Sequence, residues 1–83
     1  MENYEEKLRE IIGSVVPLTI SISEVDLDTD FRMIGMDSLA FINLVTRIED
    51  SFEIIFPDEK LIIEEASTIQ KLLVIIQECE NNG

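Results

Sequence analysis

The residues best suited to chemistry lie between Gly35 and Leu39, where one serine, Ser38, stands between Asp37 and Leu39. Asp37 is a favourable N-cap, so a helix is expected to begin at Asp37 or Ser38 and to place this hydroxyl in its first turn. Unpaired N–H groups and the positive end of the helix dipole favour a phosphodiester there. Gly35 allows a positive φ or a close approach just before the helix. A phosphodiester on Ser38 would therefore be electrostatically favoured.

The chain lacks the groups that would activate such a serine. It contains no histidine, the usual general base of serine and cysteine hydrolases and the commonest zinc ligand. Cys79, the only cysteine, falls on the apolar face of a predicted helix and is interpreted as a small core residue. We therefore predict that the chain is not an enzyme and that Ser38 accepts a group delivered by another protein. A serine hydrolase is the alternative, which turnover of an ester substrate would support.

A second spacing pattern involves acidic residues before the predicted helix. Asp26, Asp28, Asp30 and Asp37 match positions one, three, five and twelve of an EF-hand calcium loop. Phe31 stands where that loop needs glycine, and its last ligand is normally the longer Glu. We therefore predict solvated acids that bind divalent ions weakly, and we assign no metal site. A calcium titration followed by circular dichroism or NMR separates the two readings.

The composition restricts the possible partners. Eighteen acidic and six basic residues give a formal charge of -12, and the acids are spread from Glu2 to Glu80. Such a surface disfavours nucleic acids and anionic membranes, and it attracts basic proteins. No signal or transmembrane segment is recognisable, so a cytoplasmic protein is expected. We also expect a monomer. Because the chain starts at Met1 without a flanking module, we also expect a discrete, single-domain protein over residues 1–83.

The hydrophobic pattern predicts an all-α fold, a four-helix bundle of three long helices and one short helix. The helices are expected at about residues 3–16, 38–51, 58–64 and 68–80. The first should end at Pro17, and Ser67 with Gln70 resembles a capping box for the last. The residues expected in the core are Leu8, Ile12, Phe41, Val45, Ile48, Phe52, Phe56, Leu72 and Ile76.

A long connection over residues 17–36 precedes the second helix. The alternation of apolar and polar residues over 18–23 is compatible with a short extended stretch. Because loops of this length are unusual in compact domains, we expect inward side chains to hold it, namely Leu27, Phe31 and Met33.

The second helix has a face that does not fit the core stripe. At about 100° per residue, the residues on this outward side include Leu39 and Ile42, two apolar groups close to Ser38. Exposed apolar groups surrounded by acids suit transient docking of basic enzymes. The alternative is that Ile42 packs under the loop. The residues predicted to contact partners are Asp37, Leu39, Ile42, Thr46, Glu49 and Asp50.

The chain resembles the acyl carrier protein family, whose attachment motif matches Gly35-Met36-Asp37-Ser38-Leu39. The stretches 28–31, 49–59 and 67–69 are also similar to the family, so the resemblance covers about residues 4–80. It implies that a phosphopantetheinyl transferase attaches 4'-phosphopantetheine from coenzyme A to Ser38, with Asp37 and Leu39 as flanking motif residues. It further implies that acyl groups are held as thioesters and presented to acyl-transferring, ligase or synthase enzymes with basic docking surfaces.

Three residues of the second helix depart from the commonest family pattern. Ala40 and Asn43 occupy positions that are often acidic, and Arg47 adds a positive charge. These departures favour a specialised pathway of the polyketide or nonribosomal-peptide type. Fatty-acid synthesis and an aminoacyl or peptidyl carrier are the alternatives. An acidic helical interaction module without a prosthetic group is the alternative from another functional class.

Overall fold

The computed structural model describes residues 4–16 and 21–82. It contains three α-helices, and the described residues form no strand, so the predicted all-α class is confirmed. The helices are α1 (Tyr4–Val15), α2 (Ser38–Phe52) and α3 (Ile69–Asn82), and four short 3-10 turns connect them: η1 (Ile22–Glu24), η2 (Phe31–Ile34), η3 (Asp58–Lys60) and η4 (Ile63–Glu65).

The predicted short helix over 58–64 is wrong, because η3 and η4 are separate turns. Ile62 lies between them with extended dihedrals, φ -115° and ψ 130°, which interrupt any helical run. Its β-branched side chain favours that conformation. Neither turn has a side-chain N-cap hydrogen bond. Backbone hydrogen bonds close each turn, and an ion pair between Lys60 and Glu65 at 3.8 Å links the two turns.

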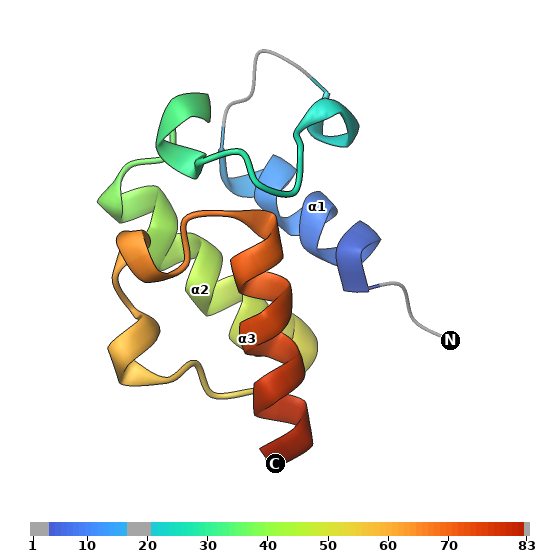
Figure 1. Ribbon diagram of the computed structural model, residues 1–83, viewed down its shortest axis with the longest axis vertical. Coiled ribbons are helices and arrows are strands. Elements are labelled where there is room, and N and C mark those ends of the chain that lie inside the picture. The colour runs from blue at the N-terminus through green and yellow to red at the C-terminus, as the bar shows by residue number, and fades with distance from the viewer. Residues whose placement is uncertain (1–3, 17–20, 83) are drawn as a thin grey trace.

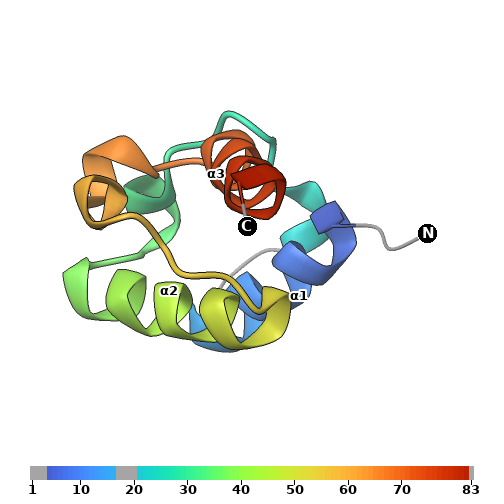
Figure 2. The same ribbon diagram turned by 90° about the horizontal axis from the view of Figure 1, so that it is seen from below.

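The three helices enclose one core. Figure 1 shows α1 beside α2 and α3, while the connection carrying η1 and η2 crosses one end of the bundle next to the start of α2. From below, α3 is seen nearly end-on and α2 lies across the view (Figure 2). All nine residues predicted for the core are buried, and Phe31, Leu44, Ile69 and Ala66 are fully buried with them. The helical periodicity therefore identified the core correctly.

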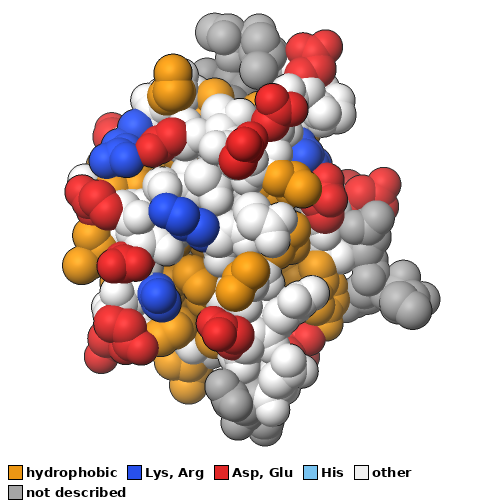
Figure 3. Space-filling view, in the orientation of Figure 1, with side chains coloured by type: hydrophobic (Ala, Val, Ile, Leu, Met, Phe, Trp, Pro, Cys, Tyr) orange, Lys and Arg blue, Asp and Glu red, His pale blue; other side chains and the backbone are white. Residues whose placement is uncertain are grey.

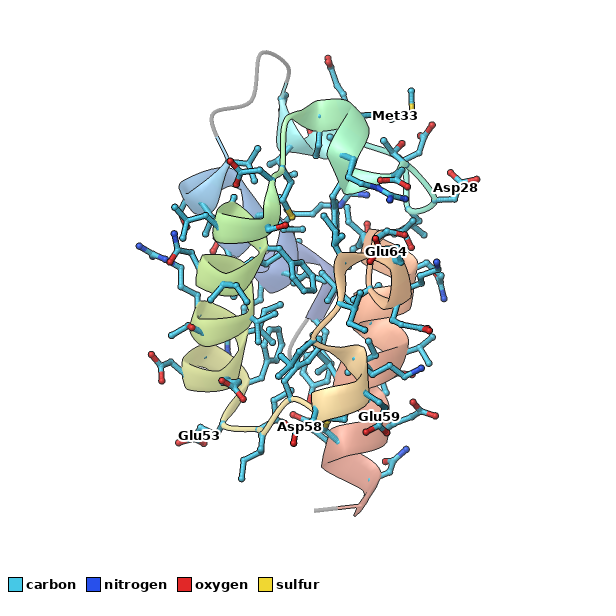
Figure 4. All side chains as sticks on the ribbon, turned by 90° about the vertical axis from the view of Figure 1, so that its left-hand side faces the viewer. Asp28, Met33, Glu53, Asp58, Glu59 and Glu64 are labelled. Carbon is cyan, nitrogen blue, oxygen red and sulfur yellow. The ribbon has the colours of Figure 1, made fainter. Side chains whose placement is uncertain are left out.

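The long connection is held differently from the prediction. Phe31 is fully buried as expected, but Leu27 is 36% exposed and Met33 is 82% exposed. The side chain of Met33 points away from the body of the protein in Figure 4. Because 3-10 residues three apart share a face, η2 turns Phe31 and Ile34 towards the core and Met33 away from it. Buried Val25 completes the attachment of this loop.

The predicted extended stretch over 18–23 holds at Ser21, with φ -66° and ψ 137°, and is wrong from Ile22 onwards. Ile22 begins the 3-10 turn η1, which Ser21 caps through a hydrogen bond from the Ser23 backbone to its hydroxyl. Residues 17–20, including the predicted helix end at Pro17, lie outside the described residues.

Arg9 of α1 fixes this loop to the bundle. Its Nη1 donates to the carbonyl oxygens of Ile22 at 2.5 Å and of Val25 at 2.7 Å, while its Nε contacts Glu5 at 2.9 Å. Hydrogen bonds from a charged donor are stronger than neutral ones. The guanidinium thus supplies an attachment that the hydrophobic pattern did not reveal.

The start of α3 corrects the predicted capping box. The hydroxyl of Thr68, not of Ser67, accepts the backbone N–H of Lys71, and the Gln70 backbone N–H donates to the Leu27 carbonyl at 3.0 Å. Ser67 is instead buried and accepts a hydrogen bond from the Lys71 ammonium. The helix continues to Asn82, two residues beyond the predicted end.

Candidate functional site

Ser38 is the first residue of α2, and its side chain is exposed. Asp37 is the N-cap in an extended conformation, with φ -102° and ψ -177°, and its Oδ1 accepts the Ala40 N–H at 2.8 Å. The Phe41 N–H donates to the Asp37 carbonyl at 2.9 Å. No acceptor within the described residues takes the N–H groups of Ser38 and Leu39. The predicted first-turn serine beside free amides is therefore observed.

Gly35 turns the chain into this helix. It has φ 95° and ψ 12°, in the left-handed region, and its N–H donates to the carbonyl of Phe31, as does the N–H of Met36 at 3.1 Å. A Cβ at this position would meet no atom within 4 Å, so the backbone conformation and not space requires glycine. Buried Met36 anchors the residue that follows, which leaves Ser38 at the surface.

The segment before Ser38 is hydrogen-bonded to the residues where α3 begins. The Phe31 N–H donates to the Ser67 carbonyl at 2.7 Å, just before α3 begins. This contact and the bond from the Gln70 N–H to the Leu27 carbonyl attach the loop to the start of α3. The site therefore rests on three elements: η2, α2 and the start of α3.

The outward side of α2 next to Ser38 is open to solvent. Leu39 is 72% exposed and Ile42 is 50% exposed, so Ile42 does not pack under the loop. The Thr46 hydroxyl donates to the Ile42 carbonyl at 3.0 Å and is thereby used within the helix. We call this surface the docking face, made up of Asp37, Leu39, Ile42, Thr46 and Asp50. Its exposure agrees with the helical spacing, and its role in binding stays a prediction.

Glu49, which was predicted to contact partners, has a structural role. Its Oε2 accepts the backbone N–H of Phe56 at 2.8 Å, and the residue is half-buried. The carboxylate thereby holds the segment after α2 against the bundle. Glu49 is half-buried, unlike the exposed residues of the docking face, and it is not counted in that face; its predicted contact with partners stays a prediction.

Asp30 of the EF-hand-like pattern is engaged by Arg32. The guanidinium contacts both carboxylate oxygens, at 2.9 and 2.6 Å, and the Arg32 backbone N–H adds a third bond. These hydrogen bonds lower the pKa of Asp30 to about 2. Asp28 is exposed, and its side chain lies at the outer edge of the protein in Figure 4. Over residues 4–16 and 21–82, no three acidic or cysteine side chains converge to hold a metal ion.

Cys79 is half-buried on α3, with its sulfur 3.5 Å from the Ile55 carbonyl. Burial and the neighbouring carboxylates of Glu78 and Glu49 raise the pKa of its thiol. It lines a hollow of about 880 Å³ with Phe52 and Ile75 among others, at the end of α2 away from Ser38. A thiol kept protonated in this way suits packing and not nucleophilic attack.

Acidic groups cover the surface widely. In Figure 3 they are scattered over the visible face, and basic groups occur at a few separate places. Among the described helices, none has the length and apolar character needed to cross a membrane.

Comparison with known proteins identifies the family. Residues 6–73 match the family described as "Phosphopantetheine attachment site". The chain is 36% identical over 74 residues to an acyl carrier protein of Phaeodactylum tricornutum, covering 88% of this chain and 92% of the relative. An acyl carrier protein homolog of Ureaplasma parvum is 37% identical over 43 residues, which is 52% of this chain and 56% of that protein.

Solved structures share the fold. Hexanoyl acyl carrier protein from the actinorhodin polyketide synthase of Streptomyces coelicolor superposes with a TM-score of 0.81 at 25% identity, covering 94% of this chain and 91% of that one. A chain in the complex of an engineered Bradyrhizobium japonicum glycine:[carrier protein] ligase with carrier protein from Agrobacterium tumefaciens and AMP also gives 0.81 at 25% identity, over 88% and 97% of the two chains. The chain is thus a non-catalytic carrier with a covalent 4'-phosphopantetheine group, and it belongs to the acyl carrier protein family.

Proposed function

We propose that Ser38 carries the 4'-phosphopantetheine arm and that the chain presents acyl intermediates of a specialised biosynthetic pathway to synthase or ligase enzymes. The observation that supports this assignment is the exposed Ser38 hydroxyl at the start of α2. Free N–H groups and the positive end of the helix dipole stabilise a phosphodiester at that position. When attached, the arm supplies a thiol that holds acyl groups as thioesters.

The other described serines are less suitable. The hydroxyl of Ser14 donates to the Ile11 carbonyl, and the hydroxyls of Ser21 and Ser23 bond to each other. Ser67 is buried, and Ser51 is half-buried at the opposite end of α2. Ser38 alone among the described serines combines an exposed side chain, a hydroxyl without an internal partner and a helix N-terminus.

In this proposal, the chain positions the hydroxyl and the transferase supplies the catalysis. The Ser38 oxygen forms a bond to the phosphorus of coenzyme A that bears the pantetheine, the phosphoanhydride bond breaks, and adenosine bisphosphate leaves. The serine proton passes to a base of the transferase. Asp37 is assigned the capping role in this step, because its Oδ1 accepts the Ala40 N–H.

Intact mass spectrometry tests the attachment. The chain is incubated with coenzyme A, magnesium and a broad-specificity phosphopantetheinyl transferase. We expect wild type and Ser51→Ala to gain one phosphopantetheinyl group and Ser38→Ala to gain none. If wild type gains nothing, the chain is an interaction module without a prosthetic group. If Ser38→Ala is still modified, the assignment of the serine is wrong.

The proposed cargo and partners rest on the similar carriers and on the docking face. One similar carrier comes from the actinorhodin polyketide synthase, and another structure holds a carrier protein in complex with a glycine:[carrier protein] ligase. Ala40 and Asn43 stand at positions of α2 that are often acidic in the family, and Arg47 adds a positive charge, which favours a specialised pathway. Loading the modified chain from malonyl-coenzyme A with a malonyl transferase, or from an amino acid and ATP with a carrier-protein ligase, distinguishes the two kinds of cargo. We expect loading by the malonyl route, and loading by the ligase alone would contradict this choice.

A further inference from the structure

One cation of the protein stands apart from the others. Arg47 is exposed on α2, and it forms no hydrogen bond or ion pair within residues 4–16 and 21–82. Every other basic side chain has a partner in that part of the structure, and these residues are Lys7, Arg9, Arg32, Lys60 and Lys71. An unpaired guanidinium is unexpected in a chain with eighteen acids and six bases. Its isolation leaves it available to another molecule.

The neighbours of Arg47 along the helix explain why it is unpaired. Asn43, one turn earlier, carries no charge, and Ser51 lies one turn later. Asp50 is three residues ahead, but a cation that precedes an acid in the chain is the weaker orientation for a helical ion pair. Nothing in α2 therefore neutralises the charge.

Arg47 borders the docking face. At about 100° per residue, it lies roughly 60° around α2 from Asp50, roughly 80° from Leu39 and roughly 140° from Ile42. It therefore occupies the edge opposite Ile42, on the same exposed side of the helix. A protein that covers Leu39 and Asp50 also covers this guanidinium.

We propose that Arg47 determines which partners the docking face accepts, by binding a carboxylate on the partner and by repelling surfaces that are basic throughout. This inference rests on the proposed carrier function. The fork of N–H groups on a guanidinium matches a carboxylate in two parallel hydrogen bonds. Like charges placed together in an interface suppress the wrong partner. The fitting partner is an enzyme with an apolar depression, cations opposite Asp37 and Asp50, and one acid opposite Arg47.

Kinetics of phosphopantetheinyl transfer test the repulsion. The probe is a transferase chosen for a uniformly basic surface around its active site, and the variants are Arg47→Gln and Gln77→Glu. Gln77 is exposed on α3, and each change takes the net charge from -12 to -13, because one positive charge is lost or one negative charge is gained. We expect Arg47→Gln to raise kcat/KM about threefold to thirtyfold over both wild type and Gln77→Glu, because it removes a cation that faces the basic surface of the transferase. Each tenfold change corresponds to 1.4 kcal/mol.

The attraction is tested with the same transferase carrying single Lys or Arg to Glu changes across its basic surface. At one of these positions, wild type should be modified faster than Arg47→Gln, which reverses their order. Raising the salt to about 1 M, where the Debye length is roughly 3 Å, should remove the difference caused by repulsion and weaken the one caused by the direct pair less.

The outcomes separate this inference from the carrier function itself. If Arg47→Gln and Gln77→Glu behave alike, or if no transferase variant reverses the order, Arg47 does not set specificity. If wild type is never modified, the proposed carrier function fails instead. Circular dichroism of each variant checks that the helices are retained.

Discussion

Replacing Arg9 by Met should loosen the loop that precedes Ser38. Methionine keeps an apolar stem of similar length but removes the donors to the carbonyls of Ile22 and Val25. The Ile22 carbonyl still accepts the Val25 N–H at 3.2 Å, whereas no other donor to the Val25 carbonyl is found in the described residues. The variant thus removes two charge-assisted bonds and leaves one carbonyl to find water.

The magnitude follows from these contacts. A hydrogen bond to a charged group contributes about 1.5–3 kcal/mol, and the Arg9 side chain is only 14% exposed, so solvent screens it little. We expect Arg9→Met to lower the free energy of unfolding by about 3 kcal/mol. A chain of this length is stable by roughly 4–12 kcal/mol, so the variant should fold with a much reduced margin.

Urea denaturation followed by circular dichroism measures the loss. With an m value of about 1.5 kcal/mol/M, the midpoint should fall by about 2 M. Glu5→Gln is the matched control, because it removes only the ion pair of Arg9 with a carboxylate that is 43% exposed, and it should cost under about 1 kcal/mol. Amide exchange should accelerate in η1 and η2 of Arg9→Met. A midpoint for Arg9→Met equal to that of Glu5→Gln would refute the reasoning.

Three further predictions concern single residues. Gly35→Ala should lower the free energy of unfolding by about 1–2 kcal/mol in thermal denaturation, because Gly35 has a positive φ. Gly13→Ala inside α1 should raise it by up to about 1 kcal/mol, because a Cβ there meets Ile22 only at 3.9 Å. Equal effects of the two changes would contradict this. The lowered pKa of Asp30 means that its pairing with Arg32 stabilises the fold above about pH 4 and that this stabilisation is lost as the pH falls towards 2. The melting temperatures of wild type and Asp30→Asn should therefore converge between about pH 4 and pH 2. A difference that stays constant over this range would exclude the pairing. Since burial raises the pKa of Cys79, iodoacetamide at pH 8 should label the thiol of the attached arm before Cys79, and the reverse order would be contrary to the structure.

The sequence alone predicted those features of the fold and the site that depend on one regular helix. The apolar period of α2 separated buried Phe41 and Ile48 from exposed Leu39 and Ile42, because a regular helix fixes which residues share a face. Asp37 likewise identified the start of α2, since an N-cap acts only within its own turn. The position of Ser38 was therefore predictable from local pattern.

The long loop and the η3–η4 segment could not be predicted in the same way. Their conformations depend on contacts between residues far apart in the chain, such as Arg9 with Val25 and Phe31 with Ser67. Hydrophobicity alone suggested that Met33 faces the core, and the 3-10 geometry of η2 reverses this. The only sequence signal for the Arg9 contact was a long cation directly after a core residue, which does not specify its acceptors.

Fragmentation mass spectrometry of the modified wild-type chain tests the central claim most directly, because it identifies the residue that bears the arm. We predict that the fragment ions which gain the phosphopantetheinyl mass all contain Ser38 and that those without Ser38 remain unmodified. An arm found on Ser51, Ser67 or any other residue would contradict the claim that the exposed first-turn hydroxyl of α2 defines the site.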